Sequence, residues 1–307
     1  MPTPRSELLF QRLPSWAILM SARMQQTRYQ PGGASAWVKL TLGAGALALA
    51  VGLAACGRGG AAWRPADTPA PPTPEESGYL RPPSPQTAQR APGGGVVLSG
   101  RSGPQARVRL SSPPPNSVAY GATARDDGQW SITTPDSPDV RLFGVAEELV
   151  GRDVQSEGYV AVLPRPGPAG VLLRAGGGAS VLVNPLLVGL RIAAVDYDGS
   201  GAAVVSGLAR PGAVARLFVD GAAAGEARVG ERGRFSISLT GSLKSGDHEV
   251  RVDCADQSVT AKFALDHPRT ISGLPYHGER TPTGWRIDWL TPGGGEQTTL
   301  IFDAAES

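Results

Sequence analysis

Residues 203–221 read AVVSGLARPGAVARLFVDG, and this stretch decides the fold class. In its second half, Leu217 and Val219 alternate with Arg216 and Phe218. A period of two places the two sets on opposite faces of a β-strand. The glycines and the proline in the stretch are turn signals. We therefore expect a short strand with one face packed inward.

The same short-strand pattern continues through the chain after residue 60. The 307 residues include 41 Gly and 28 Pro, which separate short runs rich in Val, Leu, Ile and Thr. Long apolar runs at helical spacing are absent from this part of the sequence. Short strands with a turn about every 8–12 residues are typical of a two-sheet sandwich, with a barrel as the alternative. The composition therefore predicts an all-β fold.

The opening stretch is the second copy of an internal repeat. The first copy, residues 96–110, reads VVLSGRSGPQARVRL. Farther along, DDGQWSITTP at 126–135 matches ERGRFSISLT at 231–240, with Trp130 and Phe235 in the same place. Self-similarity over such a length predicts a duplicated β domain.

Each copy also carries three consecutive glycines near its end. They lie in VLLRAGGGASVLV at residues 171–183 and in WRIDWLTPGGGEQTTLIF at residues 285–302. Glycine readily adopts the positive φ that tight reversals need. We expect a terminal hairpin in each copy, and hence two domains, at residues 96–188 and 191–303.

The second copy resembles the bacterial immunoglobulin-like modules of envelope proteins. The residues that carry the resemblance are Gly207, Ala209, Pro211, Gly212, Asp220, Gly221, Phe235 and Ser236. The first copy matches more loosely, because it lacks the Pro-Gly and Asp-Gly turns. The resemblance implies two tandem immunoglobulin-like β-sandwiches in a cell-envelope protein.

The N-terminal region has the parts of a secretory signal. Residues 40–55 form an apolar run of about 16 residues, shorter than the roughly 20 that a membrane-spanning helix needs. Basic residues precede the run and small residues end it. We expect a signal peptide over residues 1–55, with the true start at Met20 or Met24. An uncleaved single-pass anchor or a buried helix is the alternative.

The apolar run ends in LAAC at residues 53–56, which resembles the lipobox of bacterial lipoproteins. The resemblance implies that Cys56 becomes the first mature residue and carries acyl chains such as palmitate. Several chains on one residue hold a protein stably on a membrane. Gly57 stands where an Asp would direct retention in the inner membrane. The resemblance thus implies an outer-membrane lipoprotein that faces the periplasm.

Residues 56–95 form the expected linker between the lipid and the first domain. They are rich in proline and glycine and contain few branched apolar side chains. Such a composition cannot bury a core and favours extended polyproline geometry. We expect a disordered tether.

One stretch has partial calcium-loop spacing. DYDGSG places Asp196, Asp198 and Ser200 at the first, third and fifth positions of such a loop. The twelfth position is Gly207, where the loop requires a bidentate Glu. A hairpin turn is the alternative interpretation, and we expect no other metal and no cofactor.

Two aromatic side chains are candidates for ligand binding. Trp285 and Trp289 share one face of the last predicted hairpin, where a sugar ring could stack on them. Packing in the core of the second domain is the alternative.

The sequence offers little for catalysis. Cys254 lies in the alternating strand VRVDCAD, which favours a buried thiol. An enzyme that combines Cys254 with His248, His267 or His277 is a remaining possibility. An acid, a base and a nucleophile do not converge in any one region of the sequence, however, so we expect no catalytic residue.

The charge excludes one class of partner. The 29 basic and 27 acidic residues give a formal net charge of +2 and form no basic stripe, so no nucleic acid partner is expected. The predicted function is a non-catalytic, lipid-anchored structural or protein-interaction module of the envelope, with a protein or a glycan as partner. A glycan- or peptidoglycan-binding lipoprotein is the alternative.

Overall fold

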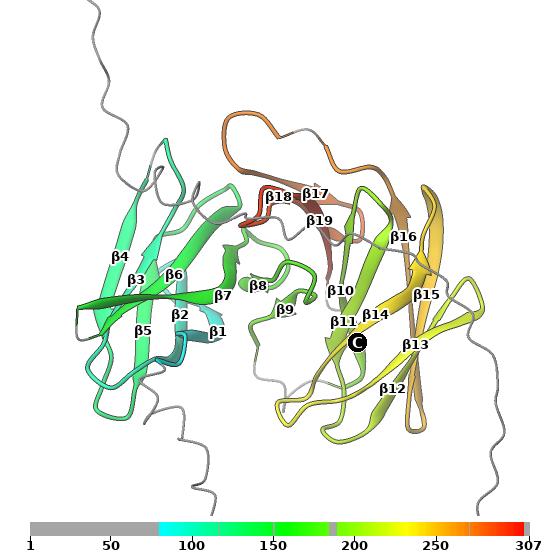
Figure 1. Cartoon of the computed structure of the whole chain (residues 1–307), viewed down its shortest axis with the longest axis horizontal. Coiled ribbons are helices and arrows are strands. Elements are labelled where there is room, and N and C mark those ends of the chain that lie inside the picture. The colour runs from blue at the N-terminus through cyan, green and yellow to red at the C-terminus, as the bar shows by residue number, and fades with distance from the viewer. Residues whose placement is uncertain (1–79, 116, 150, 184–188, 270, 304–307) are drawn as a thin grey trace, which may run out of the picture. The chain divides into compact units, whose positions relative to one another are not determined.

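The computed structural model describes residues 80–303, except 116, 150, 184–188 and 270. The described residues form nineteen β-strands and no helix (Figure 1). The strands lie in four sheets whose neighbours pair antiparallel, and the sheets form two sandwiches. The predicted all-β fold with two immunoglobulin-like β-sandwiches is confirmed.

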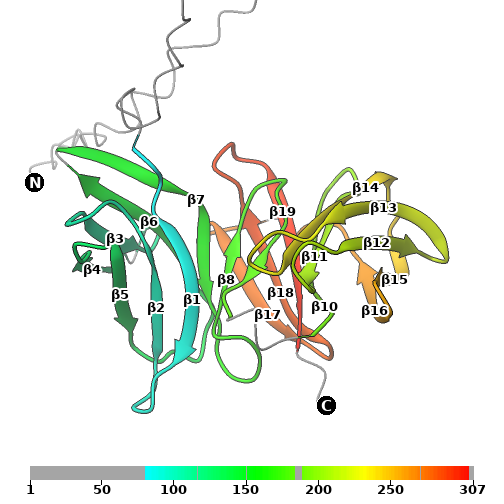
Figure 2. The same cartoon turned by 90° about the horizontal axis from the view of Figure 1, so that it is seen from below.

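The first sandwich packs a three-stranded sheet against a six-stranded sheet. The smaller sheet contains β1 (Ser84–Arg90), β2 (Val96–Arg101) and β5 (Gln129–Thr134), in the order β1-β2-β5. The larger sheet contains β3 (Arg107–Ser111), β4 (Ala119–Thr123), β6 (Arg141–Leu149), β7 (Arg152–Val162), β8 (Gly170–Leu173) and β9 (Ser180–Val181). Its order is β4-β3-β6-β7-β8-β9, and Figure 2 shows β8 beside β7.

The second sandwich packs a four-stranded sheet against a six-stranded sheet. The smaller sheet contains β12 (Val214–Val219), β13 (Ala222–Arg228), β15 (Gly246–Cys254) and β16 (Gln257–Leu265), in the order β13-β12-β15-β16. The larger sheet contains β10 (Arg191–Asp198), β11 (Ala202–Leu208), β14 (Arg234–Ser242), β17 (Tyr276–Thr281), β18 (Gly284–Leu290) and β19 (Glu296–Phe302). Its order is β14-β11-β10-β19-β18-β17.

Both sandwiches share a core of seven strands with the same connections. The sheet β1-β2-β5 corresponds to β10-β11-β14, and β4-β3-β6-β7 corresponds to β13-β12-β15-β16. A bulge interrupts the first strand of each unit at the same place, between Pro85 and Thr87 in β1 and between Ile192 and Ala194 in β10. The repeat in the sequence therefore corresponds to a repeat of this core.

A glycine and an aromatic residue explain the most conspicuous part of the repeat. Gly100 pairs with Trp130 across two strands, and Gly207 pairs with Phe235 in the same way. A Cβ atom at Gly100 would lie 2.5 Å from the Trp130 ring, and one at Gly207 would lie 2.5 Å from the Phe235 ring. Both positions must be glycine because the aromatic side chain occupies the space of the missing methyl group.

The predicted end of the linker is wrong. Residues 84–90, placed in the tether by their composition, form β1 and pair with β2. Apart from Pro85 and Ala88, which are buried, the side chains of β1 are only half-buried or exposed. Backbone hydrogen bonds to β2 hold this edge strand, so it needs few apolar residues and its composition resembles that of a tether.

The two terminal hairpins join different sheets of the shared core. Both hairpins exist, as β8–β9 and β18–β19, but β8 pairs with β7 whereas β19 pairs with β10. The two additions thus extend opposite sheets of the seven-stranded core. Which sheet a hairpin joins depends on long-range pairing, and the glycines in its turn do not specify that.

Three apolar cores hold the described residues together. Each sandwich has its own core, and a third core joins them, with Leu163 and Val171 from the first sandwich and Trp285 and Trp289 from the second. Tyr159 meets Trp289 edge to face, with ring centroids 6.0 Å apart. Because they share this buried core, the two sandwiches form one compact unit.

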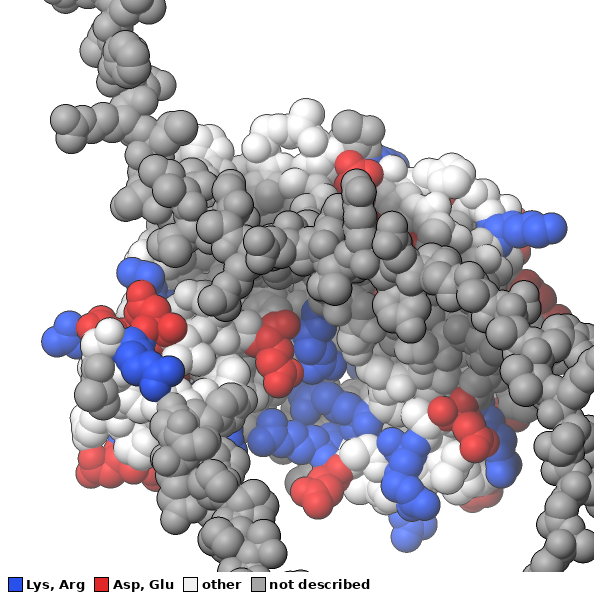
Figure 3. All heavy atoms as spheres, in the orientation of Figure 1, with Lys and Arg blue, Asp and Glu red and all other residues white. Residues whose placement is uncertain are grey.

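An arginine reinforces the junction. Arg234 in β14 donates hydrogen bonds to the carbonyl oxygens of Gln86, Val181 and Val183 in the first sandwich, over 3.2–3.4 Å. Burial lowers the pKa of Arg234, and the charges of two further arginines nearby lower it again. On the face seen in Figure 3, basic side chains gather near the centre and other charges of both signs are scattered.

Candidate functional site

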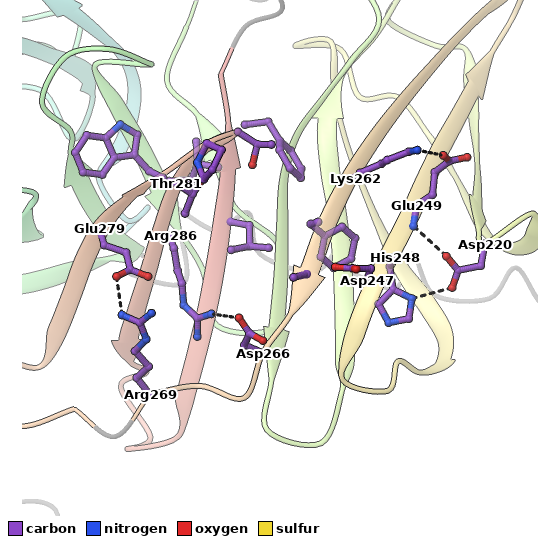
Figure 4. A pocket seen from close by; sticks show the side chains of 18 residues that line it. Asp220, Asp247, His248, Glu249, Lys262, Asp266, Arg269, Glu279, Thr281 and Arg286 are labelled. Carbon is purple, nitrogen blue, oxygen red and sulfur yellow. Dashed lines mark hydrogen bonds and ion pairs between the residues drawn. The ribbon is translucent and has the colours of Figure 1, made fainter.

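A groove of about 770 Å³ opens along one side of the second sandwich (Figure 4). It forms because the six-stranded sheet is wider than the four-stranded sheet that faces it. Strands β17, β18 and β19 continue past β10, and their inner face supplies one wall of the groove. The opposite wall comes from β16, from the start of β15 and from the turn between β12 and β13.

A buried ion pair supports the first wall. The Arg286 side chain is 4% exposed and makes a two-pronged contact with Asp288, with Nε and Nη2 each 3.0 Å from a carboxylate oxygen. Arg286 also donates to the carbonyl of His267 and lies 3.5 Å from Asp266. Desolvation acts to lower the pKa of Arg286, but the hydrogen bonds and charge of Asp288 hold it above its ordinary value. Thr298 donates to the same carboxylate, so the pair is fully bonded and fixed.

The second wall carries a histidine with an acceptor on each ring nitrogen. His248 lies 2.7 Å from Asp220 through Nδ1 and 2.8 Å from the carbonyl of Lys244 through Nε2. Desolvation lowers the pKa of His248, but the contacts with Lys244 and Asp220 raise it above its usual value overall. The backbone N–H of Glu249 and the His248 ring lower the pKa of Asp220. The imidazolium is therefore the favoured partner of Asp220.

Apolar side chains lie between the charged ones. Phe263, Leu300 and Phe302 line the groove and are each 9% exposed or less, so they form its floor and belong to the core of the second sandwich. Five carboxylates and four basic side chains surround them, and each of the basic side chains pairs with one of the carboxylates. The groove can therefore bind a chain-like ligand through apolar contacts in its floor and polar contacts at its rim.

The two tryptophans predicted as a sugar platform do not form one. Trp289 is fully buried and Trp285 is 7% exposed, and both belong to the core between the sandwiches. Their indole N–H groups donate to Thr299 and to the carbonyl of Pro166. Both side chains pack in a core, but it is the core between the sandwiches and not that of the second domain.

The residues of the calcium candidate point to different places. Asp198 accepts hydrogen bonds from Ser200 and from the N–H of Ala202, and these bonds stabilise the β10–β11 turn. Asp196 is buried and accepts from the N–H of Ala179, in the first sandwich, and from Thr299. The stretch is therefore a hairpin turn next to a buried junction carboxylate, and Asp196 and Asp198 make separate contacts.

The thiol and the histidines do not meet. Cys254 is 4% exposed and packs in the core of the second sandwich. Within the described residues, His248 contacts Asp220 and Lys244, and His267 contacts Ser245 at 3.2 Å, whereas His277 lies on β17. No contact joins any of these rings to Cys254 among the described residues. The arrangement offers no activated nucleophile there.

Several predictions fall outside the described residues. The signal peptide, Cys56 and most of the tether belong to this group, and they stay predictions. Within residues 80–303, leaving aside the short gaps, no helix is long and apolar enough to cross a bilayer.

The groove itself was not predicted from the sequence. Its best signal is the pair Arg286 and Asp288, two charged residues on one face of an otherwise apolar strand. Opposite charges two residues apart on a buried strand indicate an ion pair. The overhang that creates the groove requires knowing that β19 joins β10, which no local pattern reveals.

Comparisons with known proteins add no assignment. No family model and no curated protein matches the chain. Among solved structures, the BSP domain of a biofilm-associated protein is 13% identical with a TM-score of 0.23, and the match covers 62% of this chain and 30% of that one. The central fibronectin-III array of RIM-binding protein is 14% identical with a TM-score of 0.26, covering 72% and 89%. A Ca²⁺-stabilized adhesin from an Antarctic bacterium, described as helping it reach out and bind ice, is 13% identical with a TM-score of 0.19, covering 73% and 66%. None of these similarities assigns an activity, a ligand or a partner to this chain.

Proposed function

We propose that the chain is a non-catalytic cell-envelope protein that is anchored through acylated Cys56 and binds a partner in the groove of its second sandwich. The observation that carries the proposal is the groove itself, which joins an apolar floor to a charged rim. The sandwiches supply a rigid support for it, because their apolar junction holds them together.

The anchor completes the proposed arrangement. An acyl group on Cys56 would hold the chain at a membrane, and the residues between Cys56 and β1 would carry the sandwiches away from the surface. By the sorting resemblance of Gly57, the membrane is the outer one and the sandwiches face the periplasm.

Mass spectrometry of the mature protein from membranes tests the anchor. We expect an N-terminal acylated cysteine at position 56, and a Cys56→Ser form that is neither acylated nor retained in the membrane fraction. A mature chain that keeps residues 40–55 would refute the anchor.

Photo-crosslinking in intact cells tests the groove. A photoreactive residue at Thr281, on the groove wall, should form crosslinked species. The same residue at Arg228 is the matched control, because Arg228 is exposed at the far end of the opposite edge strand β13 and does not line the groove. Equal crosslinking from both positions, or none from Thr281, would refute the groove as the binding site.

The glycan-binding alternative loses the residues on which it depended. Both tryptophans are buried in the junction core, so no aromatic platform remains there for a sugar ring. The apolar floor and the polar rim of the groove are features shared with protein–protein interfaces.

A further inference from the structure

We infer that a pocket on the first sandwich binds the phosphate group of a phosphomonoester. The pocket has a volume of about 360 Å³ and is lined by β1, β2, β5 and the turn that precedes β5. It shares no residue with the groove of the second sandwich, so the inference does not depend on that groove. Three observations carry it: the donors in the lining, two arginines without a carboxylate partner, and the contrast with the same face of the second sandwich.

A row of hydroxyl groups forms the floor of the pocket. Thr87, Ser99 and Ser131 are direct neighbours across β1, β2 and β5. The Ser99 hydroxyl donates to that of Ser131 over 3.3 Å. The residues next to them along the strands, Leu98 and Ile132, are buried in the core, so the hydroxyl groups lie on the outer face of the sheet. Side chains this short leave a hollow between the longer side chains around them.

Longer polar side chains surround the row. Arg101 lies opposite Gln129 on the neighbouring strand, and Gln86 and Arg125 complete the polar lining. Among the described residues that line the pocket, every charged side chain is an arginine and none is a carboxylate. Guanidinium and hydroxyl groups donate to oxyanions, and a hollow lined by one sign of charge attracts the opposite sign. The lining therefore selects an anion.

Neither of these arginines is neutralised by a carboxylate of the described residues. Arg101 donates to the backbone carbonyl of Asp127 over 3.3 Å, and no ion pair there includes Arg101 or Arg125. The carboxylates of the adjacent turn have other partners, since Asp126 accepts from Gln105 and Asp127 accepts from the backbone N–H two residues later. Both arginines are exposed, so their remaining donors can reach a ligand. The groove differs, because each of its basic side chains is paired.

Positive charge continues beside the pocket. The Gln86 amide, with its oxygen toward Arg232, accepts from that guanidinium over 3.1–3.3 Å. Burial lowers the pKa of Arg234, and the nearby charges of Arg232 and Arg174 lower it further. Arg174 also acts on the buried carboxyl of Asp196, but among the described residues no ion pair includes any of these three arginines. The surroundings therefore strengthen the attraction of an anion to the pocket.

The same face of the second sandwich is covered by the chain itself. Ser206 and Ser236 are the counterparts of Ser99 and Ser131. The turn between β8 and β9 lies on them, and a Cβ atom at Gly178 would come within 2.9 Å of the Ser236 hydroxyl oxygen. In the first sandwich Ser131 is exposed and Ser99 is half-buried. This face of the shared core thus serves as a contact surface in one copy and is accessible to a ligand in the other.

The two arginines of the pocket belong only to the copy with the accessible face. The strand register places Leu208 where Arg101 stands in the first sandwich. Gly230 takes the place of Arg125, since each donates its N–H to the carbonyl of the residue four positions later. The shared core therefore does not require either arginine. An anionic ligand would give both of them a partner.

A phosphate group matches this set of donors better than a carboxylate does. One guanidinium satisfies both oxygens of a carboxylate. A phosphomonoester has three acceptor oxygens and a charge of about −1.5 to −2 near pH 7, so it can accept from two guanidinium groups and from hydroxyl groups at once. A soluble phosphomonoester and the headgroup of phosphatidic acid share this chemistry.

Equilibrium dialysis of the full chain in detergent tests the inference. The probe is radiolabelled inorganic phosphate at constant ionic strength, and the competitors are glycerol 3-phosphate and glycerate, a carboxylate of similar size. We expect saturable binding of the probe, displacement by glycerol 3-phosphate, and displacement by glycerate that is at least about tenfold weaker. No saturable binding, or equal displacement by the two competitors, would overturn the inference.

Dioctanoyl phosphatidic acid in the same micelles distinguishes the two sources of the phosphate group. Displacement stronger than that by glycerol 3-phosphate would identify a lipid headgroup, and equal or weaker displacement would identify a soluble ligand. Both results support the inference. Displacement by polyphosphate but by neither monoester would show a general polyanion surface and would overturn it.

Matched variants localise the binding. Ser131→Asp adds a negative charge to the floor of the pocket, and Ser131→Asn adds a side chain of the same size without the charge. We expect the first to weaken phosphate binding at least about tenfold and the second less than about threefold. Arg101→Gln should weaken it about tenfold. Arg109→Gln, which changes an exposed arginine on the opposite sheet of the same sandwich, should change it less than about twofold.

Thermal midpoints separate a binding defect from a folding defect. All four variants change side chains that are exposed, so each should keep the midpoint of the parent chain. Equal effects of Ser131→Asp and Ser131→Asn on binding, or of Arg101→Gln and Arg109→Gln, would overturn the assignment to this pocket.

Discussion

The two sandwiches share a seven-stranded core but differ in where the chain adds its last strands. In the first, β8 and β9 continue the four-stranded side and cover the edge of β7. In the second, β17, β18 and β19 continue the three-stranded side, and β16 stays at the edge of its sheet. The strands added to the first sandwich cover the edge of β7, whereas those added to the second form a wall next to the uncovered edge of β16. A duplicated domain can thus have a covered edge in one copy and a groove in the other without changing its core.

The added strands of the two sandwiches also pack against each other. Strands β7 and β8 of the first sandwich and β18 and β19 of the second supply seven of the fourteen buried residues in the core between the sandwiches. One face of the β18–β19 hairpin therefore lines the groove, and its other face packs in the core between the sandwiches. Position 286 points to the groove while Trp285 and Ile287 point to the junction, as the period of a strand requires.

The largest effect should come from removing the junction core. Trp289→Ala deletes a fully buried indole, and we expect a loss of about 3–5 kcal/mol in the free energy of unfolding. Trp130→Ala is the matched variant, because Trp130 is buried in the first sandwich's own core. Urea unfolding with hydrogen exchange should show exposure of both faces of the junction in the first variant and of the first sandwich alone in the second. A cost below about 1 kcal/mol for Trp289→Ala would refute the rigid junction.

The second-largest effect depends on pH and comes from Asp196, whose counterpart in the first sandwich is the neutral residue Gln89. Burial raises the pKa of Asp196 from 3.8 to about 6, against the hydrogen bonds from Thr299 and Ala179. The folded state then holds this proton more tightly than the unfolded state does. We expect the contribution of this carboxyl to the free energy of unfolding to be complete below about pH 4 and to fall by about 3 kcal/mol as the pH rises through 6, with no further loss above.

Two variants isolate this carboxyl. Asp196→Asn removes its titration, so the step between about pH 4 and pH 6 should disappear from urea midpoints measured across pH. Gln89 is the counterpart of Asp196 in the first sandwich and is exposed, so Gln89→Asp adds a carboxyl that should produce no such step. If Asp196→Asn keeps the step, another group causes it.

The third effect tests whether the two cores are equivalent. A Cβ atom at Gly100 would lie 2.3 Å from the carbonyl oxygen of Ser84, and one at Gly207 would lie 2.1 Å from that of Arg191. We expect Gly100→Ala and Gly207→Ala each to cost about 1–3 kcal/mol, because backbone and ring must both move. Gly121→Ala is the control, since its Cβ would come no closer than 3.5 Å to a neighbour. If thermal unfolding shows unequal losses of stability for the two variants, the two cores are not equivalent.

These glycines also show what the sequence could reveal. The strands of the shared core are regular and half-buried, so the alternation in stretches such as RLFVDG and QWSITT predicts them. Gly100 and Gly207 match because an aromatic ring lies over each of them, Trp130 over the first and Phe235 over the second. Local patterns therefore identify the fold and the duplication.

Features that depend on partners far along the chain could not be predicted. Strand β1 reads as tether because backbone pairing, rather than apolar burial, holds most of it. Trp285 and Trp289 look the same on a binding face and in a core until the first sandwich is placed against them. The groove depends on the pairing of β19 with β10, about one hundred residues apart, and such pairing has no local signature.

The smallest effect concerns a turn that the first sandwich lacks. Strands β12 and β13 are joined by Asp220 and Gly221, both with positive φ, whereas residues 112–118 join the corresponding strands of the first sandwich. His248 holds Asp220 from the neighbouring strand, and its pKa lies above 6.5 in the folded state overall, as the acceptors outweigh desolvation. This contribution is complete below about pH 6.5 and is lost as the pH rises through the folded pKa.

His248→Gln should remove only this pH-dependent contribution to the free energy of unfolding. Because the Asp220 side chain is 52% exposed, we expect a change below about 1 kcal/mol in the free energy of unfolding. The difference between parent and variant should be present at pH 5.5 and should shrink above the raised pKa, in thermal midpoints measured across pH. Lys262→Gln, which removes the exposed pair with Glu249 on the same wall, is the control and should shift the midpoint equally at both pH values. A difference for His248→Gln that grows as the pH rises would mean that the ring is neutral when it holds Asp220, and the turn would then be fixed by the Asp-Gly geometry and by the N–H of Glu249.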